Sequence, residues 1–232
     1  MDVILIPGFW LDASSWSEVT PALEEAGHRV HAVTLPGLEA PDAPRAGIGL
    51  ADHVAAVTRL VDGVDGPVVL VGHSGGGTVA QAVADARPDR IARVVYVDAA
   101  PMGDGDAIND ELPVVGDEIP LPEWSVFGEG MLADLDDDLR RRFRERAIPE
   151  PAGVATDPLR LTDERRLDVP TTVITCEYPS AQIQEWIAGG APFVRELAAM
   201  RQVDYVDLPT GHWPQFTRPA ELGRILVRVL EH

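Results

Sequence analysis

Lysine is absent from the 232-residue sequence, so all 19 basic residues are arginines. Without a lysine amine the chain cannot form a Schiff base with a carbonyl substrate or pyridoxal phosphate, and it lacks the lysine of a phosphate-binding P-loop. Positive charge is also scarce, because 38 acidic residues leave a formal net charge of −19. Such a surface repels polyanions, which excludes nucleic acid and an anionic membrane as expected partners.

Cysteine occurs once, at Cys176, so no intramolecular disulfide can form. No group of cysteines and histidines has the spacing of zinc ligands, and we expect neither a metal nor another cofactor. The apolar run at residues 3–6 is too short for a secretion signal, and no run is long enough to cross a membrane. These absences predict a cytoplasmic protein whose partner is a small-molecule substrate, and they leave its oligomeric state open.

Short runs rich in β-branched residues alternate with Ala-rich or amphipathic segments. The six runs are residues 3–6, 30–35, 68–71, 94–97, 171–175 and 203–208. Their continuous apolar character favours parallel strands buried on both faces, and the segments between them, such as residues 51–61 and 78–86, are typical of crossover helices. The sequence therefore predicts an α/β domain with about six mostly parallel strands flanked by helices.

The alternation stops between residues 101 and 167, where glycine, proline and acidic residues dominate. One strong helix pattern remains at residues 131–147, with acidic residues near its start and arginines further along, as the helix dipole favours. An insertion of this kind after a strand predicts a helical lid over the sheet. We therefore expect residues 1–100 and 168–232 to form the two parts of the core, and residues 101–167 to form the lid.

The strongest chemical signal is Gly72-His73-Ser74-Gly75-Gly76, a G-x-S-x-G motif between an apolar run and an Ala-rich segment. On a tight turn from strand to helix, small neighbours let the two elements approach closely, and the serine hydroxyl is pushed clear of the sheet. The N–H of Gly75, at the start of the helix, can then stabilise a developing oxyanion. These features predict that Ser74 is a nucleophile.

His212 follows the last apolar run in a loop that contains glycine, where its side chain can reach the nucleophile. We expect it to be the general base that removes the Ser74 proton and returns it to the leaving group. The other histidines flank a strand, lie in a helix or end the chain. For His73, beside the serine, we expect a packing role.

These motifs resemble the α/β-hydrolase family, and the resemblance covers nearly the whole chain. Residues 6–10, Ile-Pro-Gly-Phe-Trp, are similar to the family's oxyanion loop, and residues 210–213, Thr-Gly-His-Trp, are similar to its histidine loop. The resemblance implies the α/β-hydrolase fold, and it implies that Phe9 donates the second N–H of the oxyanion hole. The chain departs from the family at Pro7, where a histidine is common.

The acid of the implied Ser-His-Asp triad has two candidates. The family usually places it after the penultimate strand, where this chain has Glu177 and no aspartate. A second family placement, at the end of the strand before the lid, matches Asp98 and keeps the family's order of roles. We favour Asp98, which would orient the imidazole of His212 and stabilise its charged form, and we keep Glu177 as the alternative.

A serine nucleophile with a histidine base and an oxyanion hole predicts hydrolysis of a small carboxylic ester, lactone or thioester through an acyl-enzyme. Four aromatic residues are candidates for lining the substrate pocket, and they could equally attach the lid to the core: Trp10, Trp124, Phe127 and Trp213. The alternatives are a non-catalytic ligand receptor with this fold and a cofactor-free perhydrolase or lyase. The lyases of the family rely on a lysine that this chain lacks.

Overall fold

A parallel sheet of six strands, in the order β2-β1-β3-β4-β7-β8, is the centre of the computed structural model, which describes residues 1–231. The strands are β1 (Asp2–Ile6), β2 (Arg29–Ala32), β3 (Val68–His73), β4 (Ile91–Val97), β7 (Thr171–Thr175) and β8 (Val203–Asp207). Each neighbouring pair is parallel, so the carboxyl ends of all the strands lie at the same edge of the sheet. The predicted α/β fold is confirmed, and each strand overlaps its predicted run.

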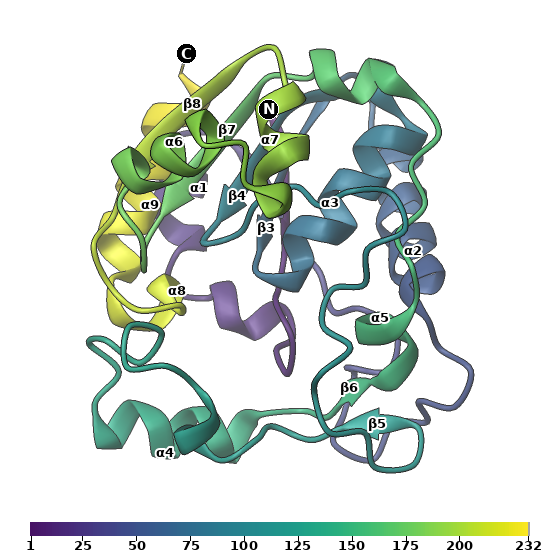
Figure 1. Ribbon diagram of the computed structural model, residues 1–232, viewed down its shortest axis with the longest axis vertical. Helices are drawn as coiled ribbons and strands as arrows, with labels where there is room; N and C mark the ends of the chain where they lie inside the picture. The colour runs from purple at the N-terminus through teal and green to yellow at the C-terminus, as the bar shows by residue number, and fades with distance from the viewer. Residues whose placement is uncertain (232) are drawn as a thin grey trace.

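Helices cover both faces of this sheet (Figure 1). Along β1, Ile4 and Ile6 pack on one face with α2 (Leu50–Gly63) and α3 (Gly75–Ala86), while Val3 and Leu5 pack on the other with α1 (Thr20–Glu25) and α9 (Pro219–Leu230). Both faces of the strand are therefore buried, which explains its uninterrupted apolar sequence. The remaining core helices are α6 (Ser180–Ala188), α7 (Arg195–Ala199) and α8 (Pro214–Thr217).

Residues 101–167, called the insertion segment below, connect β4 to β7. Residues 117–151 of this segment lie beyond the carboxyl ends of the strands, and residues 157–167 return past the end of α3 to the start of β7 (Figure 1). The segment contains α4 (Asp137–Arg146), α5 (Ala152–Thr156) and a small antiparallel pair, β5 (Glu118–Ile119) with β6 (Glu150–Pro151). Its apolar side chains form a third hydrophobic cluster with residues 9–11 and Trp213 of the core. The cluster attaches the segment to the edge of the sheet where the strands end.

The helix predicted at residues 131–147 is wrong for its first six positions, because α4 begins at Asp137. The side chain of Asp136 caps the helix by accepting the N–H of Leu139 at 2.8 Å. Before this cap, Asp134 adopts a left-handed conformation with φ +60°, and the carbonyls of residues 131 and 133 bind a core loop. Because those carbonyls have tertiary partners, they do not take part in a helix.

Within residues 1–231, no helix combines the length and the apolar character that crossing a membrane requires.

Close approach of β1, β3 and α3 depends on glycine at two positions. A Cβ atom added to Gly72 would lie 2.4 Å from the carbonyl oxygen of Gly76, and one added to Gly76 would lie 2.4 Å from that of Pro7 and 2.6 Å from that of Ile6. These neighbours are backbone atoms that cannot rotate away. The G-x-S-x-G motif is therefore a packing requirement as well as a chemical signal.

We predict that Gly76→Ala lowers the free energy of unfolding by about 3 kcal/mol, because the added methyl group overpacks a contact between backbone segments. The matched control is Gly63→Ala, at the end of α2, where an added Cβ meets nothing within 4 Å. That change should be neutral or stabilising by up to about 1 kcal/mol, since alanine favours a helix over glycine. Urea unfolding measures both, and equal effects of the two substitutions would contradict the packing requirement.

Candidate active site

Ser74 lies on the sharp turn between β3 and α3, with φ +51° and ψ −126°. A non-glycine residue holds such a conformation only where its surroundings enforce it, at a cost of about 1–3 kcal/mol. Here the Ser74 N–H donates to the carbonyl of Val97 at 3.2 Å, and the Ser74 carbonyl accepts the N–H of Gly77 at 2.8 Å. The turn directs the hydroxyl of Ser74 past the end of the sheet, towards His212.

The side chains of Ser74, His212 and Asp98 form one hydrogen-bonded row. Nε2 of His212 lies 2.8 Å from Oγ of Ser74, and Nδ1 of His212 lies 2.6 Å from Oδ2 of Asp98. Because a carboxylate only accepts, Nδ1 carries a hydrogen, and the neutral imidazole leaves Nε2 free to accept the hydroxyl proton. The structure thus brings together the three residues that the sequence placed in the triad, in the order needed for proton transfer.

Asp98 is held in an ionised form by its contacts. Burial raises its pKa, but the hydrogen bond and charge of His212 and the N–H groups of Glu177 and Cys176 outweigh burial, so the pKa of Asp98 lies below its ordinary value. These N–H groups donate to Oδ1 at 3.2 Å and 3.0 Å, on the opposite side of the carboxylate from His212. A fixed negative charge therefore faces the imidazole.

Glu177, the alternative acid, contacts Asp98 through its backbone rather than contacting His212 through its side chain. Its carboxyl points towards the insertion segment, where a Cβ added to Gly130 would lie 3.0 Å from Oε1. Partial burial and the charge of Asp98 raise the pKa of Glu177. The geometry therefore favours Asp98 over Glu177 as the partner of the imidazole.

His73 makes a contact that the sequence did not reveal. Its Nε2 lies 2.7 Å from the carbonyl oxygen of His212, and its Nδ1 lies 3.1 Å from Nε2 of Gln215. Since a carbonyl only accepts, Nε2 of His73 carries the hydrogen and Nδ1 accepts from the amide of Gln215. Burial, together with the nearby charge of His212, lowers the pKa of His73 to about 3. A neutral imidazole therefore anchors the backbone of His212, in addition to the predicted packing role.

The loop that carries His212 is also held by the insertion segment. The N–H of Gly211 donates to the carbonyl of Ala133 at 3.1 Å, and the N–H of His212 donates to the carbonyl of Met131 at 2.8 Å. A Cβ added to Gly211 would lie 2.5 Å from both of those carbonyl oxygens, so only glycine allows this approach. The general-base candidate is thus fixed from the core by His73 and from the insertion segment by two backbone hydrogen bonds.

The two candidates for the oxyanion hole, Phe9 and Gly75, lie against each other. A Cβ added to Gly75 would lie 2.8 Å from the ring of Phe9, and one added to Gly8 would lie 2.9 Å from Cβ of Ser74. Across residues 1–231, the N–H groups of Phe9 and Gly75 have no protein acceptor. Both candidate donors flank Ser74, and the positive end of the α3 dipole lies beside them. The arrangement suits an oxyanion, although Pro7 replaces the family's histidine.

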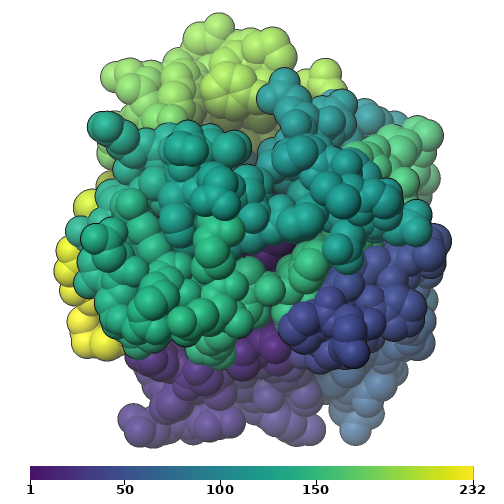
Figure 2. Space-filling model, turned by 90° about the horizontal axis from the view of Figure 1, so that it is seen from below, coloured from purple at the N-terminus to yellow at the C-terminus, as the bar shows by residue number. Residues whose placement is uncertain are grey.

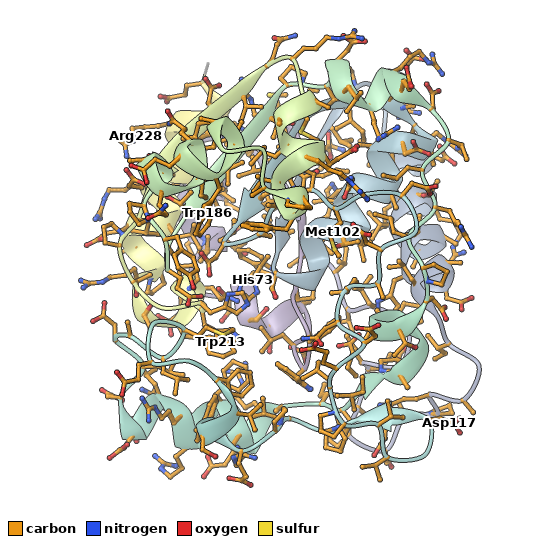
Figure 3. The ribbon with its side chains drawn as sticks, viewed as in Figure 1. His73, Met102, Asp117, Trp186, Trp213 and Arg228 are labelled. Atoms are coloured by element: carbon orange, nitrogen blue, oxygen red, sulfur yellow. The ribbon has the colours of Figure 1, made fainter. Side chains whose placement is uncertain are left out.

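The four aromatic pocket candidates meet in one cluster beside His212. Trp10 and Trp213 of the core are 5% and 2% exposed, and they lie beneath Trp124 and Phe127 of the insertion segment. The ring of Phe127 lies 5.8 Å from that of Trp10 and 5.5 Å from that of Trp213, measured between centroids. Trp213 lies on the side of His73 that faces α4 (Figure 3). These contacts attach the insertion segment, and the lining of a pocket stays a prediction.

Seen from the side of the insertion segment, the surface has an opening between teal and green parts of that segment, and the purple N-terminal part of the chain is visible at its base (Figure 2).

In the part of the chain that the structure describes, no group of three or more His, Cys, Asp or Glu side chains could hold a metal ion. Burial raises the pKa of the Cys176 thiol, so this neighbour of Asp98 is not a thiolate at neutral pH.

The sequence matches the model of the alpha/beta hydrolase family over residues 3–225, and the chain belongs to that family. It is 27% identical over 244 residues to a pyrethroid hydrolase of Sphingobium wenxiniae, covering 97% of this chain and 86% of the relative. It is 24% identical over 264 residues to methylesterase 9 of Arabidopsis thaliana, covering 98% and 97% of the two chains. These relatives are named as a hydrolase and an esterase, as expected of an α/β-hydrolase that acts on ester bonds.

Solved structures share the fold along the full chain. An extracellular α/β-hydrolase from a Paenibacillus species superposes with a TM-score of 0.78 at 22% identity, covering 98% of each chain. A pyrethroid hydrolase superposes with a TM-score of 0.72 at 21% identity, covering 100% of this chain and 98% of the other. At these identities the likeness concerns the fold.

The contacts of His73 predict that its ring stays neutral, with the hydrogen on Nε2, at pH values well below the ordinary histidine pKa. Because the pKa is lowered to about 3, the folded state binds fewer protons than the unfolded state between that value and about 6.5. Stability should therefore fall as the pH falls through this window. Long-range ¹⁵N–¹H NMR of the histidine rings reads the tautomer directly, and a doubly protonated His73 at pH 6 would contradict the assignment.

Proposed function

We propose that the chain is a serine hydrolase that cleaves a small carboxylic ester, lactone or thioester through an acyl-enzyme intermediate. The observation that carries the proposal is the row of hydrogen bonds from Ser74 through His212 to Asp98 at the carboxyl edge of the sheet. The named relatives support ester hydrolysis as the general reaction, since they include a methylesterase and a hydrolase of similar length.

In the proposed first half-reaction, Nε2 of His212 takes the hydroxyl proton of Ser74 while Oγ bonds to the acyl carbon. The acyl oxygen becomes an oxyanion that accepts hydrogen bonds from the N–H groups of Phe9 and Gly75. Asp98 stabilises the imidazolium of His212. When the tetrahedral intermediate collapses, the imidazolium protonates the leaving alcohol or thiol. Water then attacks the acyl-enzyme by the same route, which releases the acid and restores Ser74.

The aromatic cluster supports an apolar substrate group. Trp124 and Phe127 are partly exposed and pack on Trp213, whose ring contacts that of His212. A substrate group that extends from Ser74 past His212 would therefore meet aromatic rather than charged surface. We assign to the insertion segment the function of a lid, which excludes bulk water from this space and strengthens the electrostatic contacts of the oxyanion.

We predict that Ser74→Ala abolishes hydrolysis of a p-nitrophenyl ester series, with a loss of at least about 10³-fold in kcat, because no other group supplies the nucleophile. A fluorophosphonate probe should label the wild type and not the variant. Circular dichroism checks that the variant is folded. Labelling without turnover on any ester would favour a non-catalytic receptor, and peroxide-dependent activity would favour a perhydrolase.

The two acid candidates are separated by one pair of isosteric variants. Asp98→Asn should lower kcat by roughly 10⁴-fold, because the amide cannot hold the productive tautomer or stabilise the imidazolium. Glu177→Gln should change kcat by less than about threefold, since its contact with Asp98 is made by the backbone. Steady-state kinetics on the best p-nitrophenyl ester measure both, and the reverse ranking would assign the acid to Glu177.

A further inference from the structure

Trp10, the residue after the proposed oxyanion donor Phe9, has an unusual backbone conformation. Its φ of +65° lies in the left-handed region, which a bulky side chain adopts only when its surroundings enforce it. The conformation of Trp10 sets the direction of the chain just after Phe9. Whatever holds Trp10 therefore also helps to aim the N–H of Phe9 at the oxyanion position.

Three hydrogen bonds hold Trp10, and all three come from the insertion segment. The carbonyl of Trp10 accepts the N–H of Ile148 at 3.0 Å, and its indole N–H donates to the carbonyl of Ile119 at 3.0 Å. The backbone N–H of Trp10 donates to Oε2 of Glu150 at 3.1 Å. Glu150 supplies the one side chain among these partners, and it is 1% exposed.

The carboxyl of Glu150 lies close to the proposed oxyanion hole. A water-sized cavity of about 10 Å³ is lined by Glu150 and His53 together with both oxyanion candidates and their glycine neighbours: Gly8, Phe9, Gly75 and Gly76. Glu150 pairs with a backbone N–H and, within residues 1–231, makes no hydrogen bond to a guanidinium. Burying a carboxyl in such surroundings costs much free energy when it is ionised and far less when it is neutral. The position therefore calls for an explanation beyond packing.

We propose that Glu150 is a positioning residue, whose carboxyl holds the backbone of Trp10 in its left-handed conformation and thereby aims the N–H of Phe9 at the oxyanion. Glu150 does not touch the substrate and acts through Trp10. The assignment presupposes the serine hydrolase activity proposed above. It gives the insertion segment a part in transition-state stabilisation, because β6 supplies the side chain that fixes the oxyanion loop.

The charged and titratable groups around Glu150 determine how its protonation depends on pH. Burial raises the pKa of Glu150 to about 8, although the Trp10 hydrogen bond and the charge of Arg45 oppose the rise. Arg45 donates to Glu118 at 3.0 Å. His53 also lines the cavity and contacts the carbonyl of Pro36. Burial is the main cause that lowers the pKa of His53. Glu150 is therefore neutral at pH 7, and above about pH 8 its negative charge opposes the developing oxyanion.

The sign of the stability effect follows from the same shift. The folded state keeps the Glu150 proton up to about pH 8, whereas the unfolded chain releases it near the ordinary value of 4.5. Stability contributed by this site is complete below that ordinary value and is lost as the pH rises through the folded pKa. Glu150→Gln, which cannot ionise, should therefore gain in Tm over the wild type as the pH is raised.

Three variants test the proposal. Glu150→Gln keeps an acceptor for the N–H of Trp10 and cannot ionise, whereas Glu150→Leu removes the acceptor and has a side chain of similar size. Glu118→Gln is the matched control. Glu118 lies on the paired strand β5 and binds Arg45 without touching Trp10. Each is assayed for kcat and KM on a p-nitrophenyl ester from about pH 6 to pH 10. Inhibition by an aryl trifluoromethyl ketone, whose serine adduct carries an oxyanion, is measured in parallel.

Glu150→Leu should lose about 10- to 100-fold in kcat with little change in KM, and its affinity for the trifluoromethyl ketone should fall by a similar factor. Glu150→Gln should keep the wild-type kcat at pH 7 within about threefold and should lose the decline in kcat above about pH 8. Glu118→Gln should match the wild type in all of these respects. A purely structural function of Glu150 would lower Tm without this joint loss of kcat and ketone affinity.

Wild-type kcat and ketone affinity in Glu150→Leu would overturn the proposal. If that variant fails to fold, Glu150→Gln decides the question. A decline of its kcat above about pH 8 equal to that of the wild type would overturn the proposal. If the wild type itself turns over no ester, the proposed function fails and the assignment of Glu150 falls with it. The two failures are distinguishable, because the first requires an active wild type.

Discussion

The left-handed turn at Ser74 is the constraint on which the rest of the site depends. It exists because β3 and α3 meet with almost no space between them, so the positions two residues before and two residues after the serine, Gly72 and Gly76, must be glycine. The same close approach brings the carbonyls of Ile6 and Pro7 against Gly76, which places the loop of residues 6–10 beside the serine. One packing constraint thus fixes both Ser74 and the neighbouring loop that carries Phe9.

The partners of the serine come from the topology of the sheet. Because β4 lies between β3 and β7, Asp98 at its end stands beside Ser74 on one side and residues 176–177 on the other. Local pattern in the sequence was enough to predict the strands, the serine turn and the histidine loop. The preference for Asp98 over Glu177 came from the family resemblance rather than from local pattern, since both residues follow neighbouring strands, and the three-dimensional register shows that Asp98 faces His212.

Tertiary contacts explain the features that the sequence did not predict. The helix pattern at residues 131–136 is overridden because the carbonyls of Met131 and Ala133 bind the histidine loop. The contact between Trp10 and Glu150 spans 140 positions, and Glu150 lies in a proline-rich stretch that carries no catalytic motif. Nothing local distinguishes this glutamate from the many exposed acids of the chain. Its burial becomes visible only when the insertion segment is folded onto the core.

These contacts limit how far the insertion segment can move. Displacing the whole segment would break five hydrogen bonds to the loops at Trp10 and at residues 211–212, each contributing about 1 kcal/mol, and would expose the aromatic cluster to water. It would also release the loops that carry His212 and Phe9, so the open form would lack an ordered site. The opening visible in Figure 2 requires none of these losses. A ligand bound through this opening would leave the loops at Trp10 and at residues 211–212 in place, so Ser74, His212 and Asp98 would keep their arrangement before and after binding.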